Sequence, residues 1–419
     1  MTILLSKKAI TRTQAIIVIV IILIAAIATG VYFALISRPQ TPTKNEIVIG
    51  CSLSLSGANS AQATNQLNAY KLWVDQVNEK GGLFVREYGT RLPIRLVVYD
   101  DAGDATTAVK LYGKLITEDK VDVLLGPYSS AVFFAVSTVA EKYHMPIIGP
   151  TAASNDIYTR GYNYTFIGQQ TVSNWADAVV SYINSKSDLQ KIAIAASSFR
   201  VTMMMASFVK EGIEGIDREL IFYEEYPTGT QDLTALVQKM KDNNPDAVIS
   251  LGTLADNVLF VRTCKELNVN PKFFYIAVGY DAPQLLDTLG ETAEGLCGMI
   301  TFHVKLPYPG LEEFVEKYKS KYGLLPPSEC ADAYTTCQIY QAAIESANSL
   351  NPESIKEALL QLDIMTIKGR FKYGEVNGAR WINIYQVTYV GQVQNGTVEL
   401  IWPRAYATSE EIYPKPPWR

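Results

Sequence analysis

The feature that most constrains this chain is the apolar run at residues 15–36, which contains no charged side chain. A helix rising ~1.5 Å per residue over this length matches a hydrocarbon core of ~30 Å. Backbone polar groups in lipid must pair with one another, so a helix is the expected form. A core helix of a soluble domain is the alternative, but such a helix has a polar face and this run has none. We therefore predict a membrane segment.

Positive charges flank this segment unequally. Lys7, Lys8 and Arg12 precede it, whereas Arg38 and Lys44 follow it. The excess on the amino-terminal side predicts that residues 1–14 are cytoplasmic and that the remaining chain lies on the extracellular face of the membrane.

Whether the segment is retained is a separate question. Ala26 and Ala28 form a small-x-small pattern that a signal peptidase could cleave, so removal of residues 1–28 stays open. The apolar run continues to Ile36, which favours an uncleaved anchor. Residues 37–45 contain two prolines among polar neighbours and are expected to form a semi-extended tether.

The remaining residues, 46–419, exceed the usual size of a single hydrophobic core and predict two lobes. Five of the 37 basic residues precede residue 46 and no acidic residue does, which leaves 32 basic against 42 acidic residues, a formal charge of −10. Because nucleic-acid phosphates need a positive surface, this balance argues against a nucleic-acid partner.

Short aliphatic runs alternate with helix-length amphipathic segments throughout this module. Continuous apolar runs, instead of alternating ones, are typical of strands in a parallel sheet that is covered by helices on both faces. The sequence therefore predicts an α/β fold with two doubly wound parallel-sheet lobes. The expected strands are 47–51, 94–99, 121–125, 146–148, 164–167, 192–196, 220–224, 247–251 and 273–277.

Polar residues follow the strands at the ends where ligands bind in open α/β sheets. Small hydroxyl residues occur in three of the four first-lobe segments, which are 52–57, 126–130 and 149–154, while 100–104 is acidic. These segments predict a polar binding crevice.

The same segments resemble the type I periplasmic binding proteins, in the leucine/isoleucine/valine-binding branch that serves ABC transporters. The resemblance extends over nearly the whole module and rests on eight motifs in order. They are LSLSG (53–57), VNEKGG (77–82), YDDAGDATTA (99–108), LLGPYSS (124–130), TRGYNYTF (159–166), PDAVISLG (245–252), AEGLCGM (293–299) and the closing WPRAYATSEEIYPKPPW (402–418).

The resemblance implies two lobes joined by three hinge crossings, near residues 172, 299 and 383, that close over a small ligand. Lobe one would comprise 46–172 with 300–382, and lobe two 173–299 with 383–419. Such proteins deliver the ligand to a membrane permease. The alternative is a sensor ectodomain that signals through a partner chain, because related lobes also occur in receptors.

The resemblance also implies where the ligand binds. Ser129 and Ser130, next to Tyr128, match the position where a serine hydroxyl and backbone amides hold the ligand carboxylate. The start of a helix attracts an anion, although Ser130 could simply cap a helix that begins at Ala131. Ala152, Ala153 and Ser154 match the next loop, where small residues permit close backbone approach.

The departures concern the ligand's ammonium group. Val172 and Val278 occupy the positions that match its acidic partners, and an ammonium buried against them would be unpaired. The matching aromatic wall positions are Gln62, Val201 and Thr253.

Arg200 is a new charge and could grip a carboxylate, or it could be a solvated loop residue. We therefore expect a ligand with a carboxylate or amide and an apolar body but without an α-ammonium, unless Tyr280 or Asp281 supplies the missing group.

No motif predicts an enzyme, a metal or a cofactor. His144 and His303 lack a metal spacing, and no nucleophile elbow or phosphate loop occurs. Asp100, Asp101 and Asp104 fail the EF-hand pattern and are expected to cap the next helix.

Two further patterns concern an extracellular location and the cysteines. Sequons at Asn163 and Asn395 agree only weakly with an outside location. Cys51 ends VIGC, which looks like a lipid-attachment box but is expected to be a buried strand residue. Cys330 and Cys337 lie too far apart on one helix to bond, and their pairing with Cys264 or Cys297 stays open.

Overall fold

The computed structural model describes residues 11–36, 43–376 and 378–418. The predicted cytoplasmic segment 1–14 and tether 37–45 therefore lie largely outside the described residues. Two units, helix α1 and the module that begins at residue 45, are described separately.

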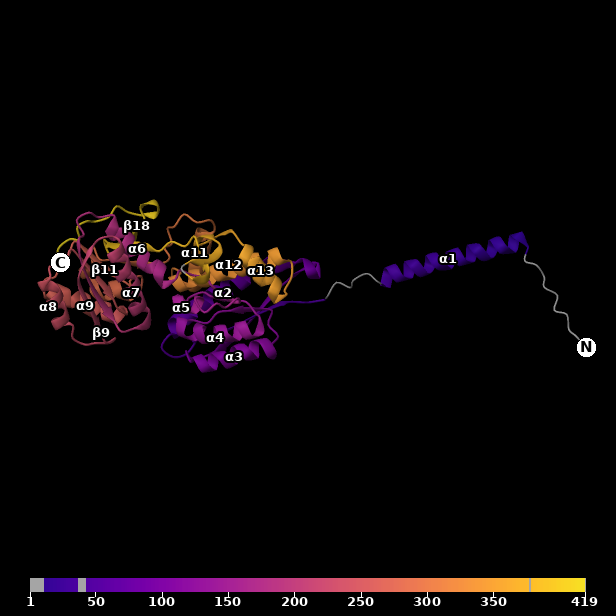
Figure 1. Ribbon diagram of the computed structural model, residues 1–419, viewed down its shortest axis with the longest axis horizontal. Coiled ribbons are helices and arrows are strands. Elements are labelled where there is room, and N and C mark those ends of the chain that lie inside the picture. The colour runs from indigo at the N-terminus through magenta and orange to yellow at the C-terminus, as the bar shows by residue number, and fades with distance from the viewer. Residues whose placement is uncertain (1–10, 37–42, 377, 419) are drawn as a thin grey trace, which may run out of the picture. The chain divides into compact units, whose positions relative to one another are not determined.

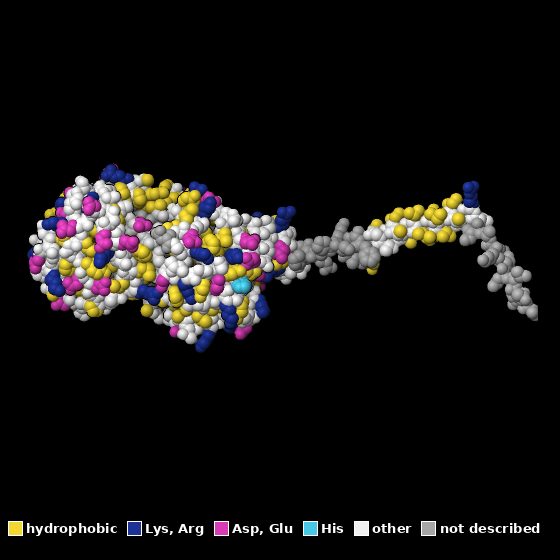
Figure 2. Space-filling model, in the orientation of Figure 1, with side chains coloured by type: hydrophobic (Ala, Val, Ile, Leu, Met, Phe, Trp, Pro, Cys, Tyr) yellow, Lys and Arg dark blue, Asp and Glu magenta, His cyan; other side chains and the backbone are white. Residues whose placement is uncertain are grey.

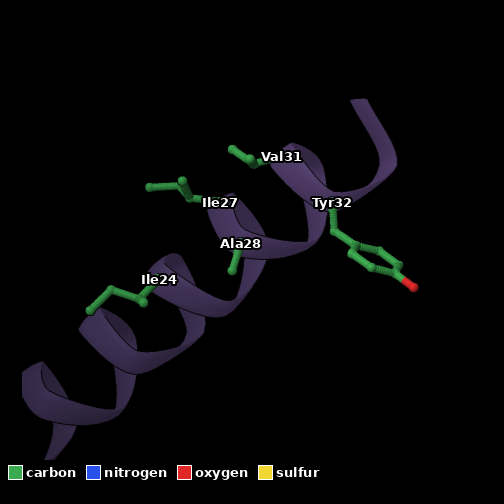
Figure 3. Close-up of a pocket in the computed structure, with 5 residues that line it drawn as sticks. All are labelled: Ile24, Ile27, Ala28, Val31 and Tyr32. Carbon is green, nitrogen blue, oxygen red and sulfur yellow. The ribbon is translucent and has the colours of Figure 1, made fainter. Parts of the chain in front are cut away.

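Helix α1 (Arg12–Ile36) covers the predicted membrane segment. Its large apolar side chains from Ile16 to Tyr32 are exposed, and Figure 3 shows five that line one stretch of this surface: Ile24, Ile27, Ala28, Val31 and Tyr32. Among the described residues, this one helix is long and apolar enough to cross a membrane. A signal sequence near an amino terminus has the same properties, so the finding fits an anchor or a leader.

A five-stranded sheet forms the core of the first lobe, in the order β4-β1-β5-β6-β7. All four neighbouring pairs are parallel. Every residue of β1 is buried, as expected for a strand covered on both faces, and Cys51 is among them. The strands are β1 (Ile47–Leu53), β4 (Ile94–Asp100), β5 (Val123–Leu125), β6 (Ile147–Gly149) and β7 (Thr165–Ile167).

A seven-stranded sheet forms the core of the second lobe, in the order β18-β17-β12-β11-β10-β8-β9. The five strands from β12 to β9 are parallel, whereas β17 and β18 continue the sheet antiparallel. The strands are β8 (Lys191–Ser197), β9 (Glu219–Tyr226), β10 (Ala247–Leu251), β11 (Phe273–Ile276), β12 (Cys297–Ile300), β17 (Tyr389–Gln394) and β18 (Thr397–Trp402). All nine predicted strands are confirmed, and the α/β fold with them.

The turn of the β17–β18 hairpin is formed by residues that were noted in the sequence. Asn395 and Gly396, noted as part of a glycosylation sequon, form its turn. Both have positive φ, at 52° and 76°, which is the backbone of the two-residue turn that matches strand twist. Asn-Gly is the usual sequence for this turn, so the pair has a structural reason to be present.

Helices pack around both sheets, and Figure 1 shows the two groups at opposite ends of the module. The first lobe has α2 (Ser60–Glu79), α3 (Ala105–Thr117), α4 (Ser130–Tyr143), α5 (Asn155–Tyr158), α11 (Leu311–Tyr322), α12 (Ser328–Ala347) and α13 (Pro352–Gln361). The second has α6 (Val172–Asn184), α7 (Arg200–Gly215), α8 (Thr234–Asp242), α9 (Leu254–Glu266) and α10 (Pro283–Leu289). Three two-stranded ribbons complete the first-lobe side: β2 (Leu83–Val85) with β3 (Thr90–Leu92), β13 (Ile364–Thr366) with β14 (Gly369–Phe371), and β15 (Tyr373–Val376) with β16 (Ala379–Asn383).

The chain passes between the two sheets three times: between β7 and α6, after β12, and between β16 and β17. Gln170 in the first passage donates a 2.9 Å hydrogen bond to the Val387 carbonyl in the third. The first and third passages are therefore tied to each other.

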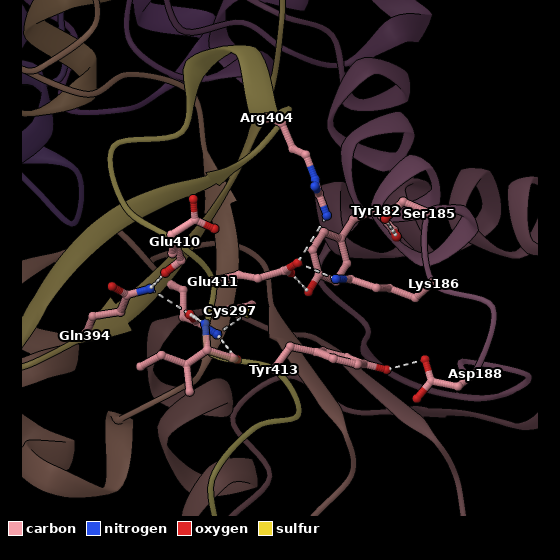
Figure 4. A network of polar contacts seen from close by, with 12 residues as sticks. Tyr182, Ser185, Lys186, Asp188, Cys297, Gln394, Arg404, Glu410, Glu411 and Tyr413 are labelled. Atoms are coloured by element: carbon pink, nitrogen blue, oxygen red, sulfur yellow. Dashed lines mark hydrogen bonds and ion pairs between the residues drawn. The ribbon is translucent and has the colours of Figure 1, made fainter.

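The last residues are fastened to the second lobe by the polar network in Figure 4. Glu411 accepts a 2.7 Å hydrogen bond from Tyr182 and forms an ion pair with Lys186. Burial alone would raise the pKa of Glu411, but these two donors outweigh it and lower that pKa. Tyr413 donates to Asp188 at 2.7 Å. Figure 2 shows acidic and basic side chains interspersed over the visible face of the module, and hydrophobic side chains covering α1.

Candidate functional site

The Ser129–Ser130 pair begins helix α4 directly after β5. The structure corrects the expected cap: α4 begins at Ser130, and Ser129 is the capping residue, accepting a 3.4 Å hydrogen bond from the Val132 amide. Ser129 has φ of 76°, in the left-handed region. Such backbone costs a non-glycine residue of order 1 kcal/mol and is concentrated at functional loops.

Ser130 and Ser154 join the ends of two neighbouring strands. The Ser130 hydroxyl accepts a 3.2 Å hydrogen bond from the Ser154 amide. Ala152 and Ala153 lie beside it, exposed by 0% and 2%. The Ser154 hydroxyl is 1% exposed and has no hydrogen-bond partner among the described residues. Buried hydroxyls are normally paired, and this oxygen is one of several buried polar atoms without a partner among the described residues.

Tyr128 is half-buried and faces acidic groups from both lobes. Its pKa is raised by burial first, and then by Glu329, Asp281 and Asp332. Asp281 follows β11 in the second lobe, while the other two acids lie in the first turns of α12. The residues predicted at the end of β5 therefore lie where the lobes meet.

The negative charges of the acidic residues near Tyr128 are not fully balanced by positive charges or hydrogen-bond donors. Burial, followed by the charge of Asp281, raises the pKa of Glu329 to about 7. Asp332 is buried in an ion pair with Lys368, and burial still raises its pKa to about 6. Burial also raises the pKa of Asp281, against a hydrogen bond from Ser328. The side chain of Asp281 is itself exposed to solvent.

Three predicted residues of the second lobe have internal roles. Val172 is fully buried in the second-lobe core, and its amide donates to the Ala153 carbonyl at 3.0 Å. Thr253 caps α9 in a reciprocal arrangement with Asp256. Tyr280 is 1% exposed and donates to the Leu296 carbonyl at 2.9 Å. The structure therefore does not bring these three side chains together with the first-lobe serines.

Arg200, at the start of α7, forms an ion pair with Asp156 of α5. The ion pair engages one guanidinium nitrogen, and the Arg200 side chain is still 65% exposed. Asp156 was not among the residues predicted from the sequence. The only signal was its place two residues after Ser154, in a predicted binding loop.

The first-lobe aspartates accept hydrogen bonds from other residues of the chain. Asp104 caps α3, as predicted, by accepting from the Thr107 amide at 2.7 Å. Asp101 does not cap but is buried and accepts from the hydroxyls of Ser52 and Ser54 at 2.6 and 2.9 Å. Asp100 accepts from loop amides, including that of Ala102. Among the described residues no cluster of three histidine, cysteine or acidic side chains could hold a metal ion.

The five cysteines are all buried and free in the structure. A separate cavity of about 190 Å³ lies within the first lobe, between α2, the β2–β3 ribbon and α12. None of the predicted site residues lines it. Its lining includes Trp73, Lys80, Arg91, Tyr334 and Glu345.

Comparisons with known proteins agree with this architecture. The sequence model of the periplasmic binding protein family matches residues 46–397. The Leu/Ile/Val-binding protein homolog 7 of Brucella melitensis is 25% identical over 390 residues, covering 89% of this chain and 96% of that protein.

Two solved structures show the same fold. A branched-chain amino acid transporter substrate-binding protein of Streptococcus pneumoniae, in complex with isoleucine, is 22% identical with a TM-score of 0.72, over 85% of this chain and 99% of its own. A solute-binding protein of an ABC transporter from R. palustris, in complex with benzoate, is 18% identical with a TM-score of 0.70, over 88% of this chain and 98% of its own.

Proposed function

The chain belongs to the periplasmic binding protein family, and from this premise we propose that it is a solute-binding protein that holds a small amino-acid-like ligand between its lobes for an ABC permease. The relative named Leu/Ile/Val-binding protein homolog 7 aligns with this chain over almost its full length. Family members are substrate-binding proteins, which places the chain among binders and not among enzymes. The family also implies a location outside the cytoplasm.

The observation that carries the ligand site is the unpaired Ser154 hydroxyl beside Ser130. With Ser129, these residues surround the amino terminus of α4, where free amide groups and the helix dipole favour an anion. A ligand carboxylate would pair with the Ser154 hydroxyl and with amides at the start of α4. Ala152 and Ala153 leave room for that approach.

The acidic groups opposite favour a ligand that also carries a positive charge. Glu329 has a raised pKa because burial disfavours its charged form and because Asp281 adds a second negative charge nearby. A ligand ammonium between them would stabilise those charges. The positions Val172 and Val278 alone suggest a ligand without an ammonium, but Asp281 and Glu329 can replace the missing partners. We therefore propose an amino acid over its deaminated analogue.

Thermal melting of the full-length chain tests this proposal, because a ligand that binds the folded state raises the melting temperature. The panel contains leucine, isoleucine, the keto acid of leucine, leucinamide and benzoate. We expect leucine or isoleucine to give the largest shift. A larger shift with the keto acid or benzoate would exclude the ammonium contact, and no shift with any member would reject this ligand class.

We propose further that α1 remains attached as an anchor and keeps the module near its permease. The excess of positive charge before the helix and the length of the apolar run support this. Carbonate extraction of membranes, with amino-terminal sequencing of the mature chain, tests retention. A mature chain that begins near residue 29 would show cleavage instead. Coprecipitation from membranes tests the partner: a permease supports transport, and a kinase or receptor supports the sensor alternative.

A further inference from the structure

Helix α5 contacts the second lobe at two adjacent residues. Asn155 donates to the Ser173 hydroxyl at 2.9 Å and accepts from the Ser173 amide at 3.2 Å, next to the first passage between the lobes. Asp156, the next residue, pairs with Arg200 at the start of α7. The second contact therefore links the first lobe to α7 by a pair of opposite charges, in addition to the hydrogen bonds at α6.

The first-lobe side of this ion pair is held in place. Tyr158 of α5 donates to the Ala152 carbonyl at 2.7 Å, and Ile157 is 1% exposed. These contacts fix α5 against the loop that contains Ser154. The second carboxylate oxygen of Asp156 is buried without a hydrogen-bond partner among the described residues. The carboxylate therefore depends on Arg200 for its compensation.

The aromatic ring of Phe134 is a second first-lobe contact of Arg200. The guanidinium lies 6.0 Å from the centre of the Phe134 ring, at the outer limit of a cation–π contact. Arg160 stacks on the same ring at 4.1 Å and donates to the Phe134 carbonyl at 2.7 Å. The ring is thus held by its own lobe and offers Arg200 a preformed surface.

We infer that Arg200 is a latch: it binds Asp156 and Phe134 across the cleft, stabilises the closed arrangement of the lobes, and slows ligand release without contacting the ligand. The inference rests on the proposed solute-binding function. It gives Arg200 a role that competes with the carboxylate-gripping role suggested by the sequence. The guanidinium nitrogen that donates to Asp156 is not available to a ligand carboxylate.

The two roles predict opposite effects of one substitution. If Arg200 is a latch, Asp156→Asn removes its partner, and leucine dissociates faster. If Asp156 instead holds Arg200 away from the ligand, Asp156→Asn frees the guanidinium, and leucine dissociates more slowly. Because the Arg200 side chain is 65% exposed and that of Asp156 33%, we expect the latch to change the rate by about two- to fivefold.

The second lobe supplies a matched control. Glu224 and Lys239 form an ion pair with side-chain exposures of 35% and 64%, but both lie in the second lobe. Glu224→Gln should leave leucine dissociation unchanged, although it removes an ion pair of equal exposure. Stopped-flow dissociation of leucine is measured for the full-length wild type, Asp156→Asn, Arg200→Gln, Glu224→Gln and the exchange Asp156→Arg with Arg200→Asp.

A second readout separates the latch from the ligand proposal. Lys110 of α3 and Glu214 of α7 are exposed, and the native cysteines are buried, so Lys110→Cys and Glu214→Cys can carry spin labels selectively. We expect a short inter-lobe distance without added ligand in the wild type, less of it in Asp156→Asn and Arg200→Gln, and its return in the exchanged pair. If leucine fails to bind at all, this measurement still decides on the latch.

The expected result is faster release in both single variants, recovery in the exchange variant, and no effect of Glu224→Gln. Slower release in Asp156→Asn would overturn the latch, and so would equal effects of Asp156→Asn and Glu224→Gln. An inter-lobe distance distribution that is unchanged by Arg200→Gln would overturn it independently of any ligand.

Discussion

The two lobes use the residues at their strand ends differently. In the first lobe, Ser130 and Ser154 connect neighbouring loops, and the Ser154 hydroxyl has no partner among the described residues. In the second lobe, Thr253 caps a helix and Tyr280 fills the core. The comparison suggests that the first lobe binds the ligand with preformed polar groups. The second lobe contributes Asp281 and the Arg200 contact when the lobes meet.

The largest expected effect concerns the second-lobe core. A Cβ added at Gly298 would lie 2.1 Å from Cγ of the Tyr280 ring. Since Tyr280 is buried and hydrogen bonded, the ring cannot move aside, and Gly298→Ala should lower the free energy of unfolding by about 3 kcal/mol or more. Urea unfolding measures this change.

Gly113→Ala in α3 is the control, because a Cβ there meets nothing within 4 Å. Alanine is the better helix former, so this variant should gain up to about 1 kcal/mol. If Gly298→Ala were as stable as the wild type, Tyr280 would be free to leave the core and could still reach the ligand.

The next effect separates binding from stability in the two lobes. Ser154→Ala should leave the free energy of unfolding unchanged, because its hydroxyl has no partner in the described chain, but should weaken leucine binding about tenfold. Thr253→Ala should do the reverse, with loss of about 1 kcal/mol of stability and little change in affinity. Calorimetric titration and urea unfolding of both variants test the pair. If both variants changed leucine affinity and the free energy of unfolding to the same extent, the proposed difference between the lobes would be wrong.

How far the sequence predicts this molecule depends on the kind of signal. Continuous apolar runs located nine strands, because the burial pattern of a strand is local in sequence. The β17–β18 pair was missed although Asn395-Gly396 is a hairpin turn. The resemblance to the family located the serines, and the start of a helix after a strand gives a physical reason for their expected role.

The interactions between the lobes could not be predicted in the same way. Asp156 and Arg200, or Asp281 and Ser328, are distant in sequence, and no local pattern brings them together. Tyr280 illustrates a related limit. Its neighbour Asp281 is exposed, whereas Tyr280 is buried. An alignment to the family that is wrong by one residue therefore exchanges an exposed residue for a buried one.

The smallest expected effect is a pH dependence. The pKa of Glu329 in the folded, ligand-free protein is raised to about 7, above the value of about 4.3 for an unperturbed glutamate. The folded state therefore binds this proton more tightly than the unfolded state, and Glu329 makes stability fall as the pH rises from about 4.3 through 7.

Glu329→Gln should remove part of this fall and raise the melting temperature at pH 8 by a few degrees or less relative to the wild type. The exposed Glu316 of α11 provides the control Glu316→Gln, which should not alter the slope. Thermal melting between pH 5 and pH 8 measures the difference. An unchanged slope in Glu329→Gln would mean that Glu329 is well solvated and does not face Asp281.

The most direct test of the account is native mass spectrometry of the full-length chain purified from its host without added ligand. We predict a single small molecule with the mass of an amino acid bound to the wild type, and its loss from a variant with Ser130→Ala and Ser154→Ala that still folds. Retention of the same molecule by that variant would contradict the proposed site. A bound molecule without an amine, identified by fragmentation, would contradict the proposed ligand class.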